Sequence, residues 1–132
     1  MSISDSYTAL NALLQGNSTL TALLGTYTGT SIPLIKGGIL AESEGNLPAI
    51  AFDVEPSLKT HFMNDDNFLI NVYAATARES YLVAKTIIDQ FNEAQTPVDG
   101  YFTNTTCNIL TQVTDPTSKE VNTPVSFRLV NM

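Results

Sequence analysis

The side chains of this chain that could perform nucleophilic chemistry are its one histidine, His61, and its one cysteine, Cys107. A Cys–His pair needs a hydrogen bond between the two side chains and a third group that orients the imidazole. His61 falls in a polar segment and Cys107 in a predicted strand, and no Asn or Asp stands where it would orient the histidine. The alternative interpretation is an exposed loop histidine and a small apolar core cysteine. We therefore expect no catalytic residues and no enzymatic activity.

Hard oxygen ligands for a cation gather at Asp65 and Asp66, close to Asn67 and His61. Their spacing matches no calcium-binding loop, because the residues do not alternate so that several ligands point inward together. An acidic turn is the simpler interpretation. The Gly37-Gly38 pair precedes neither a capped helix nor a phosphate-binding lysine, so it predicts no phosphate loop. We expect no metal site and no cofactor.

Acidic residues are concentrated in one part of the chain. Between Ala41 and Asp66 there are six acids and one base, Lys59. The acids are Glu42, Glu44, Asp53, Glu55, Asp65 and Asp66. Acids on exposed loops keep a monomer soluble, which is one interpretation. The other is that these loops form a negatively charged face of an assembly.

The length of 132 residues fits a single domain, residues 1–132. The net charge of −7 argues against binding to nucleic acid or to an anionic membrane, because both require basic patches. One cysteine excludes an intrachain disulfide and indicates a reducing cytoplasm. The N-terminus shows no signal peptide, and no apolar run approaches a membrane span. Only 14% of the residues are charged, which indicates either a surface covered by partners or a Thr-rich β protein.

The elements that must position these residues begin with two predicted helices. Leucines at helical spacing predict a first helix that ends near Gly16 and a shorter second one, capped by Asn17 or Ser18, that ends at Gly25. Alternating apolar residues then predict strands, and Pro33 confines the first to a sheet edge. The expected strands are 32–35, 49–54, 67–73, 101–113 and 121–130. Tyr73 breaks the alternation of the third strand, which suggests cover on both faces.

A long helix is predicted from the capping box of Thr76 and Glu79 to about Ala94, ended by Thr96-Pro97. The residues of its expected apolar face are spaced three and four positions apart along the helix. That face comprises Ala77, Tyr81, Ala84, Ile88 and Phe91, widened by Leu82, Val83 and Ile87. A helix this apolar should be well buried. The element order predicts an α+β two-layer sandwich: a mainly antiparallel sheet, one long helix packed on a face, and an N-terminal helical hairpin.

Several of these segments together resemble the tail-terminator (tail-completion) proteins of tailed bacteriophages. The segments are the Leu-Leu-Gly turn in 20–25, the Pro-led strand in 47–52, the strand 68–73 that runs into the helix 78–94, and the final β-hairpin. The resemblance spans nearly the whole chain.

The resemblance implies a homo-oligomeric ring, usually a hexamer, at the head-proximal end of a phage tail. Such a ring caps the tail tube protein, docks to neck or head-completion proteins, and lets DNA pass without binding it specifically. The expected location is the virion, after assembly in the host bacterial cytoplasm, with no membrane contact. The alternatives are a head–tail connector adaptor or tail tube subunit, and a cytoplasmic small-ligand or peptide-binding module.

The segment Ser57–Asp66 has no motif that maps onto the family, so its role as an arm between subunits is a hypothesis. It is either a mobile loop or a hairpin arm that orders against a partner. Its candidate subunit-interface residues are His61, Phe62, Met63 and Asn64. The candidates for an acidic face toward the lumen are Glu42, Glu44, Asp65 and Asp66, on charge alone.

Overall fold

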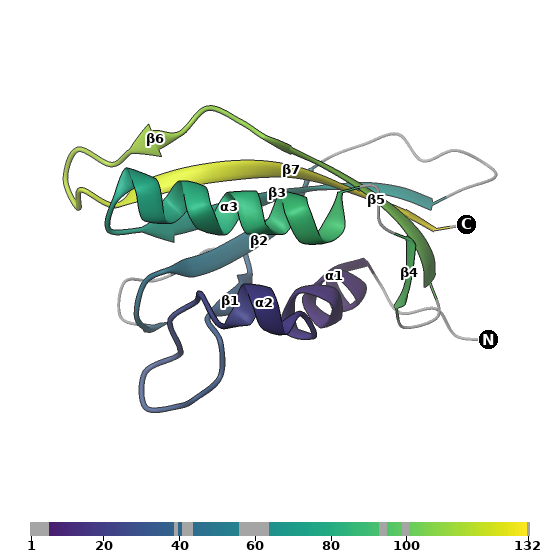
Figure 1. The fold of residues 1–132 in the computed structure, drawn as a ribbon, viewed down its shortest axis with the longest axis horizontal. Coiled ribbons are helices and arrows are strands. Elements are labelled where there is room, and N and C mark those ends of the chain that lie inside the picture. The colour runs from purple at the N-terminus through teal and green to yellow at the C-terminus, as the bar shows by residue number, and fades with distance from the viewer. Residues whose placement is uncertain are drawn as a thin grey trace.

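The computed structural model describes residues 6–38, 40, 44–55, 64–92, 95–98 and 101–131 (Figure 1). The helices within these residues are α1 (Ser6–Gln15), α2 (Ser18–Thr21) and α3 (Ala77–Phe91). The strands are β1 (Ile35–Gly37), β2 (Ala49–Glu55), β3 (Asn64–Ala74), β4 (Gln95–Val98), β5 (Tyr101–Ile109), β6 (Val113–Thr114) and β7 (Val121–Asn131).

The strands form one mixed sheet in the order β1-β2-β3-β7-β5-β4, with β6 added on β7. Only β1 and β2 are parallel among the described strands, and every other pair is antiparallel. The central pair β3–β7 is in register over eleven residues, from Asn64 opposite Asn131 to Ala74 opposite Val121. A mainly antiparallel sheet with one long helix packed on it confirms the predicted α+β class.

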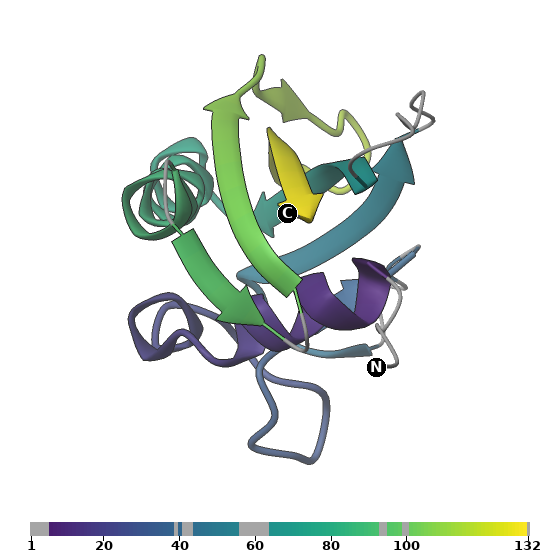
Figure 2. The ribbon, with the colours of Figure 1, turned by 90° about the vertical axis from the view of Figure 1, so that its right-hand side faces the viewer.

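The sheet is strongly curved, as the contacts of α1 require. Strands β1 and β4 are the two ends of the strand order, yet α1 contacts both of them. Neighbouring strands lie about 4.8 Å apart. A helix about 10 Å wide reaches both edges only if the sheet curls around it. Figure 2 shows this curl, with α1 and α3 on the inner side of the strands.

The core fills the concave face, because alternate residues of the strands point toward the helices. In β3 and β7 these are Phe68, Ile70, Val72, Val121, Thr123, Val125 and Phe127, all buried. Phe52 meets Phe68 edge to face, with ring centroids 6.2 Å apart. Phe91 meets Phe127 in the same way at 6.0 Å, which ties the end of α3 to the sheet. Leucines of α1 and α2 belong to the same core.

The buried face of α3 differs from the predicted one. Thr76 caps the helix as expected, since its hydroxyl accepts the Glu79 N–H at 3.2 Å. The buried residues, however, are Ser80, Val83, Ala84, Ile87 and Phe91. Tyr81 and Leu82 are 47% and 45% exposed, so the helix is not covered on all sides. Ser80 is part of the buried face, because its hydroxyl finds polar partners inside the core.

Two predictions near the end of α3 and in the following strand are wrong. The helix ends at Phe91, and the Thr96-Pro97 pair expected to end it lies in strand β4. Pro97 is tolerated there because β4 is an edge strand. The expected strand 101–113 is divided into β5, which ends at Ile109, and the two-residue β6. Leu110 lies between them and is 43% exposed.

The crossing of two loops depends on two glycines. The Gly25 N–H donates to the Pro48 carbonyl at 2.8 Å, and the Asn46 N–H donates to the Thr26 carbonyl at 3.0 Å. A Cβ atom on Gly25 would lie 2.0 Å from the Asn46 oxygen, and one on Gly45 would lie 2.2 Å from the Thr26 oxygen. The absence of side chains at both positions therefore lets segment 44–48 lie against segment 25–27.

Candidate functional site

Of the two residues considered for nucleophilic chemistry, the structure describes Cys107 alone. Cys107 is buried in β5, and its backbone N–H donates to the Asn92 side-chain oxygen at 3.0 Å. Burial raises the pKa of the Cys107 thiol to about 12, which keeps it protonated and unreactive. His61 lies outside the described residues. Within the described residues, no group of three His, Cys, Asp or Glu is placed to hold a metal ion.

Most of the predicted subunit-interface residues, His61, Phe62 and Met63, also lie outside the described residues. Asn64 was expected in the same loop, but it is the first residue of β3 and stands opposite Asn131 of β7. The loop prediction is wrong for Asn64 because β7 extends far enough to pair with it. Polar sequence alone did not reveal that pairing.

The acidic residues proposed for a channel face fall into three groups by their place in the structure. Glu42 lies outside the described residues. Asp65 and Asp66, expected in the loop, belong to β3 and pair with β7. Glu44 forms an ion pair with Lys36, and both side chains are mostly covered, at 24% and 34% exposure. The charge of Glu44 is therefore compensated within the chain rather than presented alone.

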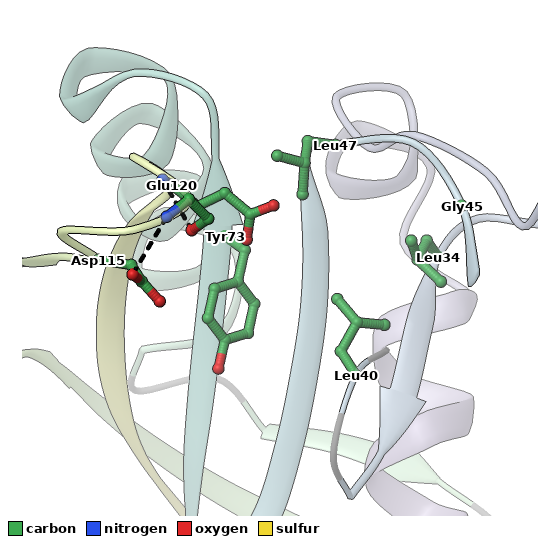
Figure 3. A pocket seen from close by; sticks show the side chains of 8 residues that line it. Leu34, Leu40, Gly45, Leu47, Tyr73, Asp115 and Glu120 are labelled. Carbon is green, nitrogen blue, oxygen red and sulfur yellow. Dashed lines mark hydrogen bonds between the residues drawn. The ribbon is translucent and has the colours of Figure 1, made fainter. Parts of the chain in front are cut away.

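A cleft lies beside Tyr73 among the described residues. Two adjoining cavities of about 260 and 300 Å³ form it. Both are lined by Tyr73, Asp115 and Glu120. The first is also lined by Leu34, Leu40, Gly45, Leu47 and Ser118, and the second by Val113, Thr114, Pro116 and Asn122. Figure 3 shows Tyr73 between two walls, with leucines on one side and the two carboxylates on the other.

The carboxylate wall is held by the turn that leads from β6 into β7. The Asp115 carboxylate accepts the backbone N–H groups of Thr117 at 2.8 Å and Ser118 at 3.2 Å. These two hydrogen bonds lower the pKa of Asp115, so it stays ionised. The Asp115 N–H donates to the Glu120 carbonyl at 2.9 Å, which closes the turn. Lys119 has a φ of 65°, a left-handed backbone that this closure requires.

The floor of the cleft contains the polar side chains of Tyr73 and Asn122. Burial, and then the nearby Glu120 carboxylate, raise the pKa of Tyr73, which keeps its phenol protonated. Asn122 donates through Nδ2 to Asn71 Oδ1 at 3.0 Å. The Oδ1 atom of Asn122 is buried and has no hydrogen-bond partner among the described residues. An unsatisfied acceptor of this kind is uncommon in native structures.

Sequence reasoning did not identify this cleft, although two of its parts left signals. The break in alternation at Tyr73 marked a residue with unusual surroundings. The segment 115–118 was recognisable as a turn. The leucine wall comes from residues 34–47, and only the folded sheet brings that segment beside 113–122. Neither segment alone indicates a cavity.

None of the helices within the described residues combines the length and the apolar character needed to cross a membrane.

Comparison with known proteins gives a fold-level likeness. No protein-family model matches this chain, and no curated protein sequence matches it. A chain in the solved structure of the virion of a native gene transfer agent (GTA) particle is similar in fold, with a TM-score of 0.59. The alignment covers 93% of this chain and 91% of that chain, at 15% sequence identity. At this identity the likeness shows a shared fold over nearly the full length of both chains.

Proposed function

We propose that this chain is a structural, non-catalytic protein of a phage-like virion. The observation that carries the proposal is the fold shared over 93% of the chain with a component of a gene transfer agent virion. Two observations support the same class of particle. They are the fold comparison and the element order read from the sequence. The surroundings of Cys107 support the non-catalytic part, because a buried, protonated thiol is a poor nucleophile.

Within that class, we propose the more specific role of a tail terminator. Copies of the chain would form a ring, a hexamer by the family resemblance, that caps the tail tube and docks to the neck. The net charge of −7 suits a lumen through which DNA passes without adhering, because like charges repel. The virion is the proposed location, with assembly in the bacterial cytoplasm.

The outer face of the sheet supports assembly by contact between copies. Side chains on the face away from the helices are half-buried or exposed and mostly uncharged. On β3 and β7, outside the residues described above as lining the cleft, they are Asn67, Leu69, Asn71, Pro124, Ser126 and Arg128. A surface poor in Lys and Glu resembles the interior of protein interfaces in composition.

One experiment separates the terminator from its structural alternatives. Purified protein is sized by light scattering and imaged alone, and is then added to polymerising tail tube protein. A terminator forms single rings and stops tube growth, whereas a tube subunit polymerises into filaments by itself. A connector adaptor forms rings without affecting tube length. A protein that stays monomeric and never enters a particle would contradict the virion proposal.

The segment before β3 offers a sharper test of ring formation. Replacing Phe62 and Met63 together by serine is expected to weaken assembly while the isolated domain stays folded, because both apolar side chains are proposed to contact a sister subunit. The matched control replaces Tyr81 and Leu82, two exposed apolar neighbours on α3, by serine. Unchanged ring formation in the first variant would remove the segment from the interface.

The cleft beside Tyr73 is the one observation that favours the remaining alternative, a small-ligand or peptide-binding module. Its two cavities, about 260 and 300 Å³, fall at or below the lower end of the roughly 300–1,000 Å³ typical of ligand pockets.

A further inference from the structure

We propose that the cleft beside Tyr73 binds an arginine side chain supplied by a different protein of the particle. This inference rests on the proposed virion function for the source of the partner. It names the cleft as an interaction site, in addition to the contacts between copies of the chain. Two features carry it: the hydrogen-bonding character of the lining, and the arrangement of the walls.

The charged groups that line the cleft are both negative. Asp115 and Glu120 contribute carboxylates, which only accept hydrogen bonds, beside the hydroxyls of Tyr73, Thr114 and Ser118. None of the described residues that line the two cavities is Lys, Arg or His. A ligand that satisfies this lining must bring several donors and a positive charge. Guanidinium has five N–H donors in a planar fork that matches carboxylates.

The walls of the cleft suit the rest of an arginine side chain. Leu34, Leu40 and Leu47 form an apolar wall opposite the carboxylates (Figure 3). An arginine stem can pack against leucines while the charged head reaches the polar side. The Tyr73 ring lies between the two walls, where a guanidinium stacks on an aromatic face. Lysine lacks both the planar stacking surface and the fork, so arginine fits this arrangement better.

Charge assigns the occupant to a different protein, because this chain has six Lys and Arg residues against thirteen Asp and Glu residues. Lys36 is engaged by Glu44, and Lys85 lies 3.6 Å from Asp89. Copies that each carry a net charge of −7 also repel one another when an acidic cleft is the point of contact. A basic segment of another particle protein brings the complementary charge.

The test titrates the full chain, labelled with ¹⁵N, with N-acetylarginine amide and, separately, with the neutral isostere N-acetylcitrulline amide. We expect saturable shifts of the backbone signals of Tyr73 and of residues 113–122 with the arginine compound. We expect at least about tenfold weaker binding of the citrulline compound, because charge-assisted hydrogen bonds are lost. Equal shifts with both compounds, or shifts spread over the whole surface, would overturn the proposal.

The variants Glu120→Gln and Glu79→Gln make a matched pair, since each removes one negative charge. Glu120→Gln is expected to weaken binding of the arginine compound about tenfold, while Glu79→Gln, on the exposed first turn of α3, leaves it unchanged. An equal loss in both variants would mean non-specific attraction and would refute the site. A protein that enters particles but does not bind arginine disproves only this inference. A protein that binds arginine here but never enters particles disproves only the virion function.

Discussion

Removing the Ser80 hydroxyl tests whether a buried polar contact sets the orientation of α3. Ser80 is fully buried, and its hydroxyl donates to the Val72 carbonyl of β3 at 2.8 Å. The same oxygen lies 2.6 Å from Thr123 Oγ1 of β7. Thr123 Oγ1 also accepts from Gln112 Nε2 at 2.9 Å, in the segment before β6. One hydroxyl thus connects the helix to both central strands.

The expected cost of Ser80→Ala follows from these contacts. Each buried hydrogen bond contributes about 0.5–1.5 kcal/mol, so two lost bonds cost roughly 1–3 kcal/mol. Alanine is the better helix former and returns about 0.5 kcal/mol. The net destabilisation is therefore about 0.5–2.5 kcal/mol. The 132-residue domain lies between the two size classes of the relation between stability and melting temperature, so the melting temperature falls by about 2–10 °C.

Thermal and urea unfolding measure this effect, with Thr86→Ala as the control. Thr86 is also on α3, but its hydroxyl donates to the Leu82 carbonyl at the exposed surface, so its removal should cost less than about 0.5 kcal/mol. The double variant Ser80→Ala, Thr123→Val replaces both hydroxyls and should lose less stability than the sum of the single variants. A melting temperature for Ser80→Ala equal to that of Thr86→Ala would refute the reasoning.

Three further perturbations have defined outcomes. Gly45→Ala should destabilise the fold by about 1–3 kcal/mol in urea unfolding, because its Cβ would lie 2.2 Å from the Thr26 oxygen. Gly29→Ala, which has open space around it, should cost only about 1 kcal/mol for its φ of 76°. Cys107 should resist alkylation at pH 8 until the protein is unfolded. Because folding raises its pKa from 9.0 to about 12, the thiol leaves stability unchanged below pH 8 and reduces it as the pH rises past 9. A Cys107→Ala variant should lack that component. Glu44→Gln should cost less than about 1 kcal/mol, because its ion pair is partly exposed.

The parts of the fold that sequence predicted well are those with local signals. The Thr76 cap and the strand that begins at Ala49 depend on neighbouring residues alone, and the structure confirms both. The face of α3 was predicted in part, since Val83, Ala84, Ile87 and Phe91 are buried as expected. Ser80 was missed because it reads as a polar, outward residue. Its partners, Val72 and Thr123, lie in other elements and are visible only after folding. Strand β4 was missed for a similar reason, since Gln95–Val98 forms a strand by antiparallel pairing with β5.

The cleft could not be predicted, because it belongs to no single segment. Leu47 and Glu120 are far apart in sequence, and each has an ordinary local context. The carboxylates of Glu44 and Glu120 also look equivalent in sequence. Folding pairs the first with Lys36 and leaves the second at the edge of a cavity. Charge counting along the chain cannot make that distinction.

Two surfaces of the described residues, the outer face of the sheet and the cleft beside Tyr73, differ in the partner that each suits. Asn and Ser side chains on the outer face of the sheet both donate and accept hydrogen bonds, so identical copies can satisfy one another there. The carboxylates of the cleft only accept, so two such clefts cannot satisfy each other, and a cationic partner is required. If the chain both forms rings and docks to a second protein, the sheet face should carry the first contact and the cleft the second. Glu120→Gln should then leave ring formation intact while weakening attachment of the second protein.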